Sequence, residues 1–188
     1  MSKTNIVVYT DGSCIGNGNV NANGGIGIYF PNKELKNVSK VYRHKRCTSS
    51  RTELYAILLA IKLIKQSYNL DDTTIDIYSD SKYSISCITK WAKNWEKNGW
   101  IKTDGLPVKN KEYICAIYKY FKLYNINFHH VHAHTKKSDE FSEYNDNADK
   151  LAKQATQRSI MENKKNKNQT KSRTRYDDDV EIVLVGID

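Results

Sequence analysis

The sequence predicts an α/β domain in which helices pack against a β-sheet. Three stretches lead to this prediction. The run Ile6–Tyr9 is β-branched or aromatic throughout, which is typical of a strand buried on both faces. Residues 54–64 repeat apolar side chains at the spacing of a helix with one buried stripe. Residues 74–80 form a second apolar strand that, like the first, ends in an aspartate.

The length of 188 residues suits one well-buried domain with a modest extension. We expect the domain over residues 1–160. Residues 161–176 contain almost no apolar side chains and are predicted to form a basic, disordered linker. Residues 177–188 are acidic and then β-prone. This tail could pair with the edge of the domain's own sheet or a partner's, or stay free, so its partner is left open.

The sequence shows no membrane or secretion signal. No run approaches the roughly 18 apolar residues of a membrane span, and the N-terminus lacks the apolar centre of a signal peptide. We therefore expect an intracellular protein, cytoplasmic or nuclear, with no membrane association, and take a monomer as the default. The cysteines lie far apart without a CxxC pair, which favours reduced thiols over a zinc ribbon or a disulfide framework.

The formal net charge of +9 lies entirely in residues 1–160, because basic and acidic residues balance in 161–188. Such an excess favours a polyanionic partner, although a solvated lysine-rich face is the alternative. Residues 90–111 interleave lysines with Trp91, Trp95 and Trp100. Lysines neutralise phosphates and indole rings stack on bases or sugars, so this segment suits a nucleic-acid groove, unless the tryptophans pack inward.

The first strand is followed by a glycine- and asparagine-rich loop at 14–25 and by predicted strands at 26–30 and 38–45. The domain is thus predicted to open with a strand meander. A dinucleotide-binding motif or P-loop is excluded, because the loop leads to a strand and not to a helix.

Two acids stand at the ends of the next elements. Glu53 is expected in the first turn of the helix, where an acid would also favour the helix dipole. Asp80 ends the strand at 74–80 and precedes a predicted helix at 82–91, which it could simply cap.

The last elements are a strand at 127–135 and a helix beginning at Asn145, with Asp149 about one turn in. His130, His132 and His134 share one face of that strand. A zinc site there is conceivable, but no Asp or Cys completes a ligand pattern.

Four acids are thus expected at element ends: Asp11, Glu53, Asp80 and Asp149. Four carboxylates brought together need cations, and Mg²⁺ prefers oxygen ligands. Two such ions could activate a water and stabilise the leaving oxygen in phosphodiester hydrolysis. An acidic metal centre on a basic protein indicates a nuclease.

Five motifs carry a resemblance to a known family: TDGS at 10–13, RTELYAI at 51–57, SDS at 79–81, the Trp/Lys segment at 91–111, and HAHT followed by NDNADKLA. With these the chain resembles a type 1 ribonuclease H, of the eukaryotic-like kind with a basic protrusion, from residue 5 to about 157. The N-terminal hybrid-binding domain of many eukaryotic relatives is not expected here. The resemblance implies the ribonuclease H-like fold, a five-stranded mixed sheet of order 3-2-1-4-5 flanked by helices.

The same resemblance implies the activity and the cofactor. The expected reaction is endonucleolytic cleavage of the RNA strand of an RNA/DNA hybrid, leaving 5′-phosphate and 3′-hydroxyl ends. Two Mg²⁺ ions are expected, with Mn²⁺ as the alternative. The four acids match the family's metal-binding carboxylates. His134 matches a mobile histidine that assists proton transfer or product release, here in a longer loop than is common.

The resemblance also implies which residues contact the substrate. The DNA-strand phosphate pocket corresponds to Arg46, Thr48 and Asn110, and the aromatic contacts to the DNA strand correspond to Trp91 and Tyr83. The RNA-strand contacts correspond to Asn17, Ser49 and Ser50, where the two serines replace amide side chains. The resemblance thus implies a discrimination: 2′-hydroxyl contacts demand RNA on one side, and the phosphate pocket demands a deformable DNA strand on the other.

Two other functions are weighed. A hybrid-binding protein without catalysis would use the same groove, but it would not need the four acids and His134. An integrase-like or Holliday-junction nuclease shares the fold, but the Trp/Lys segment and the 2′-hydroxyl positions argue against it.

Overall fold

The computed structural model describes residues 4–44, 46–132 and 140–178, with side chains as far as residue 166. Its strands are β1 (Thr4–Ile15), β2 (Asn23–Tyr29), β3 (Val38–Val41), β4 (Thr73–Ser79) and β5 (Asn125–His130). Its α-helices are α1 (Ser49–Ser67), α2 (Lys82–Ser86), α3 (Ala92–Lys97), α4 (Lys111–Leu123) and α5 (Glu140–Asp178). A 3₁₀ turn at Leu70–Asp72 precedes β4, and a π-helical turn at Cys87–Trp91 joins α2 to α3.

The strands form one mixed sheet in the order β3-β2-β1-β4-β5. The pairs β1–β2 and β2–β3 are antiparallel, whereas β1–β4 and β4–β5 are parallel. The predicted fold class and strand order are therefore confirmed. Strand β1 is longer than the sequence suggests: it continues past Asp11 to Ile15, because Asp11 to Ile15 still pair with β2.

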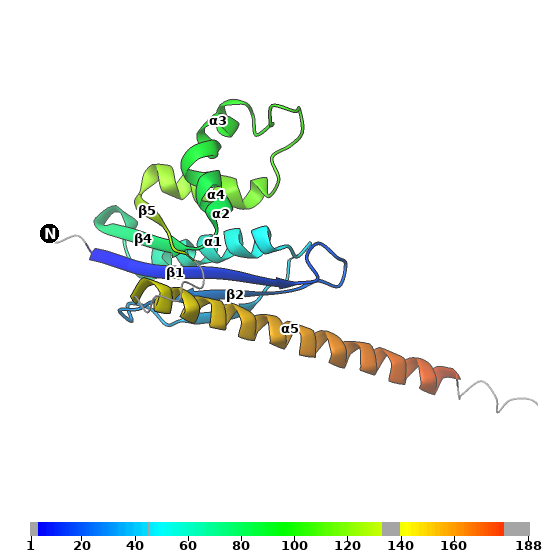
Figure 1. The fold of residues 1–188 in the computed structure, drawn as a ribbon. Coiled ribbons are helices and arrows are strands. Elements are labelled where there is room, and N and C mark those ends of the chain that lie inside the picture. The colour runs from blue at the N-terminus through cyan, green and yellow to red at the C-terminus, as the bar shows by residue number, and fades with distance from the viewer. Residues whose placement is uncertain (1–3, 45, 133–139, 179–188) are drawn as a thin grey trace, which may run out of the picture.

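Helices cover both faces of the sheet (Figure 1). On one face the apolar stripe of α1, including Leu54, Ile57 and Ile61, packs with α4 against the central strands and forms the main core. On the other face a smaller cluster joins Tyr9 of β1 to Ala148 of α5. No helix within the described ranges is long and apolar enough to cross a membrane.

Helix α1 begins at Ser49, after its N-cap Thr48, whose side-chain oxygen accepts a hydrogen bond from the Arg51 amide. Glu53 therefore lies beyond the first turn, and the first turn contains no acidic residue. The expectation that Glu53 serves the helix dipole is wrong, since that effect fades after the first turn.

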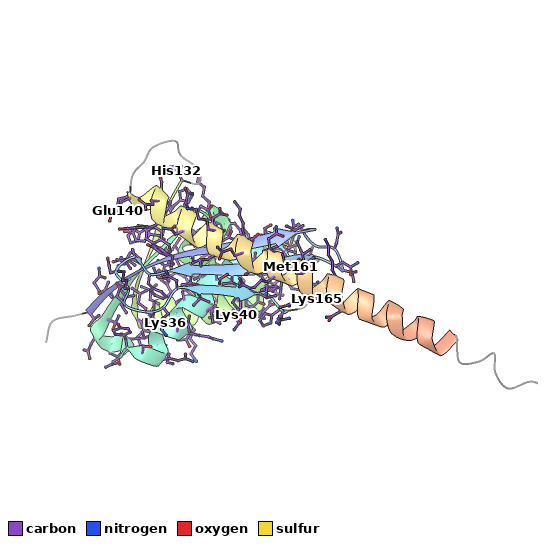
Figure 2. The ribbon with its side chains drawn as sticks, turned by 90° about the horizontal axis from the view of Figure 1, so that it is seen from below. Lys36, Lys40, His132, Glu140, Met161 and Lys165 are labelled. Atoms are coloured by element: carbon purple, nitrogen blue, oxygen red, sulfur yellow. The ribbon has the colours of Figure 1, made fainter. Side chains whose placement is uncertain are left out.

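Helix α5 begins at Glu140, five residues before the predicted start, and continues through the stretch predicted as a disordered linker. No glycine or proline interrupts residues 140–178, so a helix started on the sheet can propagate along this polar sequence. Figure 2 shows α5 crossing the sheet from Glu140, near His132, past Met161 and Lys165 and on beyond the body of the protein. Residues 179–188 of the predicted tail lie outside the described residues.

The segment predicted as one helix at 82–91 is instead α2 followed by the π-helical turn, and α3 continues directly from Ala92. Ser81 caps α2 through its side chain, which accepts from the Ser84 amide. Asp80 is therefore not the N-cap, and its carboxylate is left for another role. Helix α3 and the loop after it project from the body of the protein (Figure 1).

Candidate active site

Asp11 and Glu53 meet because Gly12 has no side chain. Asp11 lies in the middle of β1, and Gly12 follows it on the face that α1 covers. A Cβ atom at Gly12 would stand 2.3 Å from the backbone nitrogen of Glu53, a distance that real contacts do not reach. Glycine thus lets the second turn of α1 press against β1 and brings the Glu53 carboxyl to Asp11.

A second glycine allows an equally close approach of a helix on the other face of the sheet. Gly27 of β2 pairs with Asp11. A Cβ atom there would stand 1.9 Å from the carbonyl oxygen of Ala148 in α5. The close approach of α5 places Asp149, the next residue, at the edge of the acidic cluster. Asp149 thus lies in the third turn of α5, and not one turn from its start.

The side chains of Asp11, Glu53 and Asp80 form a compact carboxylate cluster, with one oxygen from each lying within 4.8 Å of the others. Asp11 is buried, and Glu53 and Asp80 are half-buried. Asp149 lies outside this 4.8 Å group, but its charge acts on both Asp11 and Asp80. Acids separated by long stretches of chain therefore meet at one place.

The cluster holds negative charge at an energetic cost. Burial, with the charges of Asp80 and Asp149, raises the pKa of Asp11 to about 6. Burial, with the charge of Asp11, raises the pKa of Glu53 well above its ordinary value, and the two carboxyl groups share a hydrogen bond. Burial, with the charge of Asp149, also raises the pKa of Asp80. A cation among these groups would relieve the repulsion.

The donor set fits a divalent metal ion. It consists of carboxylate oxygens, which Mg²⁺ and Mn²⁺ prefer over nitrogen or sulfur. Glu53 Oε2 is buried and has no hydrogen-bond partner among the described residues, so it is available as a ligand atom.

Two residues beside the cluster, Asn145 and Lys153, were not predicted from the sequence to be part of the site. Asn145 is buried and its side chain hydrogen-bonds Asp80, which holds that carboxylate in place. Lys153 Nζ lies 2.6 Å from Asp149 Oδ2, one helical turn further along α5. The i,i+4 spacing of Asp149 and Lys153 was visible in the sequence, whereas the approach of Asn145 to Asp80 depends on how α5 packs.

Comparison with known protein families identifies the chain. The family model described as RNase H matches residues 3–157, a range that contains all four acids and both glycines.

The chain belongs to the ribonuclease H family.

Curated members of the ribonuclease H family are similar over most of this range. A probable ribonuclease H of Acanthamoeba polyphaga mimivirus is 46% identical over 149 residues, which cover 79% of this chain and 65% of that protein. The chain therefore spans somewhat less than two thirds of that relative's length. A ribonuclease H of Clostridium botulinum is 37% identical over 152 residues, covering 80% of this chain and 94% of that protein.

Solved ribonuclease H structures share the fold. The solution structure of the PFV RNase H domain superimposes with a TM-score of 0.63 at 24% identity, covering 80% of this chain and 93% of that domain. LC9-RNase H1, a type 1 RNase H with the type 2 active-site motif, superimposes with a TM-score of 0.65 at 21% identity, covering 85% of this chain and 75% of the other. The ribonuclease H family is metal-dependent, in agreement with the carboxylate cluster.

Several residues expected to contact the DNA strand of a ribonuclease H substrate lie together. The Asn110 side chain hydrogen-bonds Tyr83 and accepts from Arg51 at 3.4 Å. Tyr83 in turn packs edge-on against Trp91, with ring centroids 6.4 Å apart. Arg51, which the sequence did not single out, joins α1 to α4 through a 2.6 Å salt bridge to Glu112.

The three tryptophans of the Trp/Lys segment differ in exposure. Trp91 is 42% exposed, whereas Trp95 and Trp100 pack against the main core. The inward-packing alternative thus holds for two of the three rings and leaves Trp91 available for contact.

The remaining expected contacts gather at the start of α1. Thr48 is the half-buried N-cap, and Arg46 is exposed two residues before it. Asn17 Oδ1, in the loop between β1 and β2, accepts a hydrogen bond from the Ser49 amide at 3.0 Å. Ser50, half-buried, follows in the first turn of α1. The expected RNA-strand residues therefore come from two segments that contact each other.

His134 lies outside the described residues. Of its two neighbours on the predicted strand, His130 Nε2 lies 3.2 Å from the Asp80 carbonyl oxygen, and the His130 and His132 rings are 5.0 Å apart. Within the described part of the chain, the His, Cys, Asp and Glu residues form one group that could hold a metal ion, and neither histidine belongs to it.

Proposed function

We propose that this protein is a type 1 ribonuclease H with a basic protrusion. In this proposal it is an endonuclease that hydrolyses the RNA strand of RNA/DNA hybrids and leaves 5′-phosphate and 3′-hydroxyl ends. The observation that carries the proposal is the cluster of Asp11, Glu53 and Asp80, whose oxygens meet within 4.8 Å in a chain of this family.

The catalytic ions are proposed to be two Mg²⁺, with Mn²⁺ as a substitute. Asp11, Glu53, Asp80 and Asp149 would hold them. When bound, the ions would lower the pKa of a water and stabilise the leaving oxygen of the phosphodiester. The protein's own contribution is to fix the carboxylates: Gly12 and Gly27 set their approach, and Asn145 orients Asp80. His134 is proposed to assist proton transfer or product release.

The substrate contacts are proposed to read both strands. Asn17, Ser49 and Ser50 would contact RNA 2′-hydroxyl groups, which distinguish RNA from DNA. Arg46, Thr48 and Asn110 would bind a phosphate of the DNA strand, and Tyr83 and Trp91 would pack beside its sugars. A foamy viral protease-reverse transcriptase, of which 20% matches the fold of this chain, has been solved in complex with an RNA/DNA hybrid.

End-labelled substrates in Mg²⁺ test the proposal. The panel is an RNA/DNA hybrid, duplex RNA, duplex DNA and a DNA duplex with one ribonucleotide, each with and without EDTA. We expect cleavage confined to the RNA of the hybrid, abolished by EDTA and restored by excess Mg²⁺ or Mn²⁺. Cleavage of duplex DNA, or cleavage that EDTA does not affect, would overturn the assignment.

A second set of measurements separates catalysis from binding. Asp80→Asn should abolish cleavage and retain hybrid binding, because the carboxylate serves the metal ions and not the substrate backbone. Tight hybrid binding by the unaltered protein without any cleavage would instead support the hybrid-binding function. Comparable cleavage by Asp80→Asn would refute the role given to this carboxylate.

A further inference from the structure

Two cysteines from distant parts of the chain lie in contact beside the proposed substrate site. Cys14 is near the end of β1, and Cys47 immediately precedes the N-cap of α1. The Cys47 thiol donates a hydrogen bond to Cys14 Sγ, with the two sulfurs 3.2 Å apart. Both are free thiols; Cys47 is 6% exposed and Cys14 is half-buried.

The β1–β2 hairpin keeps the two thiols in contact. Cys14 of β1 pairs with Gly24 of β2. A Cβ atom at Gly24 would stand 2.5 Å from Cys47 Sγ, so the Cys47 thiol occupies the space that a side chain at Gly24 would fill. The Cys47 carbonyl also accepts a hydrogen bond from the Gly18 amide at 3.0 Å. The two sulfurs are therefore held together by β1, β2 and the loop between them.

We propose that Cys14 and Cys47 are an oxidative modification site at which a peroxide forms a reversible disulfide, and that the disulfide weakens binding of the nucleic-acid substrate. The second half of this proposal rests on the function proposed above. Bond formation requires the sulfurs to approach from 3.2 Å to about 2.05 Å, a movement of about 1 Å.

The chemistry assigns different roles to the two thiols. Burial, with the hydrogen bond to Cys14, raises the pKa of Cys47 to about 12, so Cys47 stays protonated at neutral pH. Cys14 is the accessible nucleophile: its thiolate attacks one peroxide oxygen and releases hydroxide, which forms a sulfenic acid. The Cys47 sulfur then displaces the hydroxyl group from Cys14, and its proton leaves in the water formed. Two thiols lose two electrons in total, and hydrogen peroxide is reduced to two waters.

The disulfide would act on the substrate site because of the position of Cys47. Thr48 of the proposed phosphate pocket is its neighbour, and Ser49 is held by Asn17 of the β1–β2 loop. Drawing Cys47 toward β1 shifts the start of α1 relative to this loop and so moves both sets of contacts. Glu53 lies a full turn further along α1, so hybrid affinity should change more than the cleavage rate at saturating substrate.

The first experiment tests the bond itself. The reduced protein, residues 1–188, is treated with hydrogen peroxide, alkylated and digested with trypsin without reductant. Cys14 and Cys47 fall in tryptic peptides 4–33 and 47–51, and the other cysteines fall in 83–90 and 112–119. We expect linked 4–33 and 47–51, reversed by dithiothreitol and absent in Cys14→Ser. Cross-linking of Cys87 or Cys115 in preference to this pair, or no link at all, would overturn the proposal.

The second experiment measures hybrid binding and cleavage before and after oxidation, with Cys87→Ser and Cys115→Ser as matched controls that keep the pair. We expect oxidation to raise the dissociation constant for the hybrid roughly tenfold, about the effect of losing one charge-assisted hydrogen bond, with recovery on reduction. The control variants should respond in the same way, and Cys14→Ser should not respond. Unchanged affinity of fully cross-linked protein would overturn the effect on binding.

Different outcomes would disprove the modification site and the proposed nuclease function. If the reduced protein cleaves hybrids but no Cys14–Cys47 link forms, the modification site is wrong and the nuclease function stands. If the link forms but the reduced protein neither binds nor cleaves a hybrid, the proposed function is wrong.

Discussion

At the scale of single residues, Asp11 illustrates the conflict between stability and chemistry. Its carboxyl group lies 6% exposed in the middle of a strand, beside two other acids. A pKa raised to about 6 means that the folded protein resists the charged form that a metal ligand needs. The group therefore destabilises the metal-free fold at neutral pH, as is common for residues retained for function.

The first prediction concerns pH and stability in the presence of EDTA. The folded-state pKa of Asp11, about 6, exceeds the ordinary value of 3.8, so between these values the folded protein binds more protons than the unfolded chain. Stability should therefore rise as pH falls from 7 toward 4, by up to about 3 kcal/mol from this group. Denaturant unfolding at several pH values measures it.

The matching variant is Asp11→Asn, which should be more stable than the unaltered protein at pH 7 and lose that advantage near pH 4. Asp104→Asn is the control, because Asp104 is exposed and paired with Lys102, and its removal should bring no such gain. Equal pH dependence of the unaltered protein and Asp11→Asn would contradict the prediction.

At the scale of elements, the site depends on how closely α1 and α5 approach the sheet. The missing side chains of Gly12 and Gly27 allow two helices on opposite faces to reach two neighbouring strands: α1 presses on β1 at Gly12, and α5 presses on β2 at Gly27. Three contacts then hold α5 in register with β2 and β3: Ser39 Oγ donates to the Leu151 carbonyl, Arg158 donates to the Ser39 carbonyl, and Ser159 donates to Asn23.

Gly27→Ala should therefore damage both stability and activity. Its Cβ atom would press on the backbone of α5 at Ala148, which no side-chain rotation can relieve, so we expect a loss of about 2 kcal/mol. Asp149 would move away from Asp11, and cleavage should fall at least tenfold. Ile28→Val is the control: this neighbour faces the main core, so it should cost about 1 kcal/mol and leave cleavage unchanged.

The Trp/Lys segment gives a third prediction. Trp91→Ala should weaken hybrid binding roughly tenfold with little change in melting temperature, because the ring is 42% exposed and available for stacking. Trp95→Ala should lower the melting temperature and change hybrid binding little, because that ring packs against the core. Fluorescence anisotropy with labelled hybrid and thermal unfolding measure the two effects. A melting temperature that drops more for Trp91→Ala than for Trp95→Ala would refute this division.

At the scale of the whole molecule, the net charge and the long helix α5 should both favour binding of a nucleic acid. The net charge of +9 should attract the phosphate backbone before any specific contact forms. Helix α5 continues beyond the body of the protein (Figure 2), and its sequence from Lys164 to Arg175 is rich in basic residues. These residues would release additional counterions from a bound hybrid.

Deleting residues 162–188 should consequently weaken hybrid binding at low salt and flatten the dependence of affinity on salt concentration. The cleavage rate at saturating hybrid should stay the same, since the acids are untouched. A shorter deletion, of residues 179–188, is the control because it retains every basic residue of the helix. Low-salt affinity unaffected by the longer deletion would exclude a contribution from α5.

The sequence by itself determined the fold class and the ribonuclease H family, and it singled out three acids, Asp11, Glu53 and Asp80, that the structure brings together. Apolar runs, helical spacing and acids at element ends are local patterns, and they act over a few residues through backbone geometry and burial. The end of β1, the position of Glu53 beyond the first turn and the helical continuation of α5 were predicted wrongly, because each depends on partners far along the chain.

Only the tertiary structure decided how the acids meet. Asp11 and Glu53 are 42 positions apart in the sequence, and their contact depends on Gly12; the approach of Asp149 depends on Gly27 in another strand. The contact between Cys14 and Cys47 depends on Gly24 in the same way. A glycine in a sequence does not reveal which backbone will occupy the space beside it. That is decided when the strands take their register and the helices pack against them, because close packing admits one arrangement of neighbours.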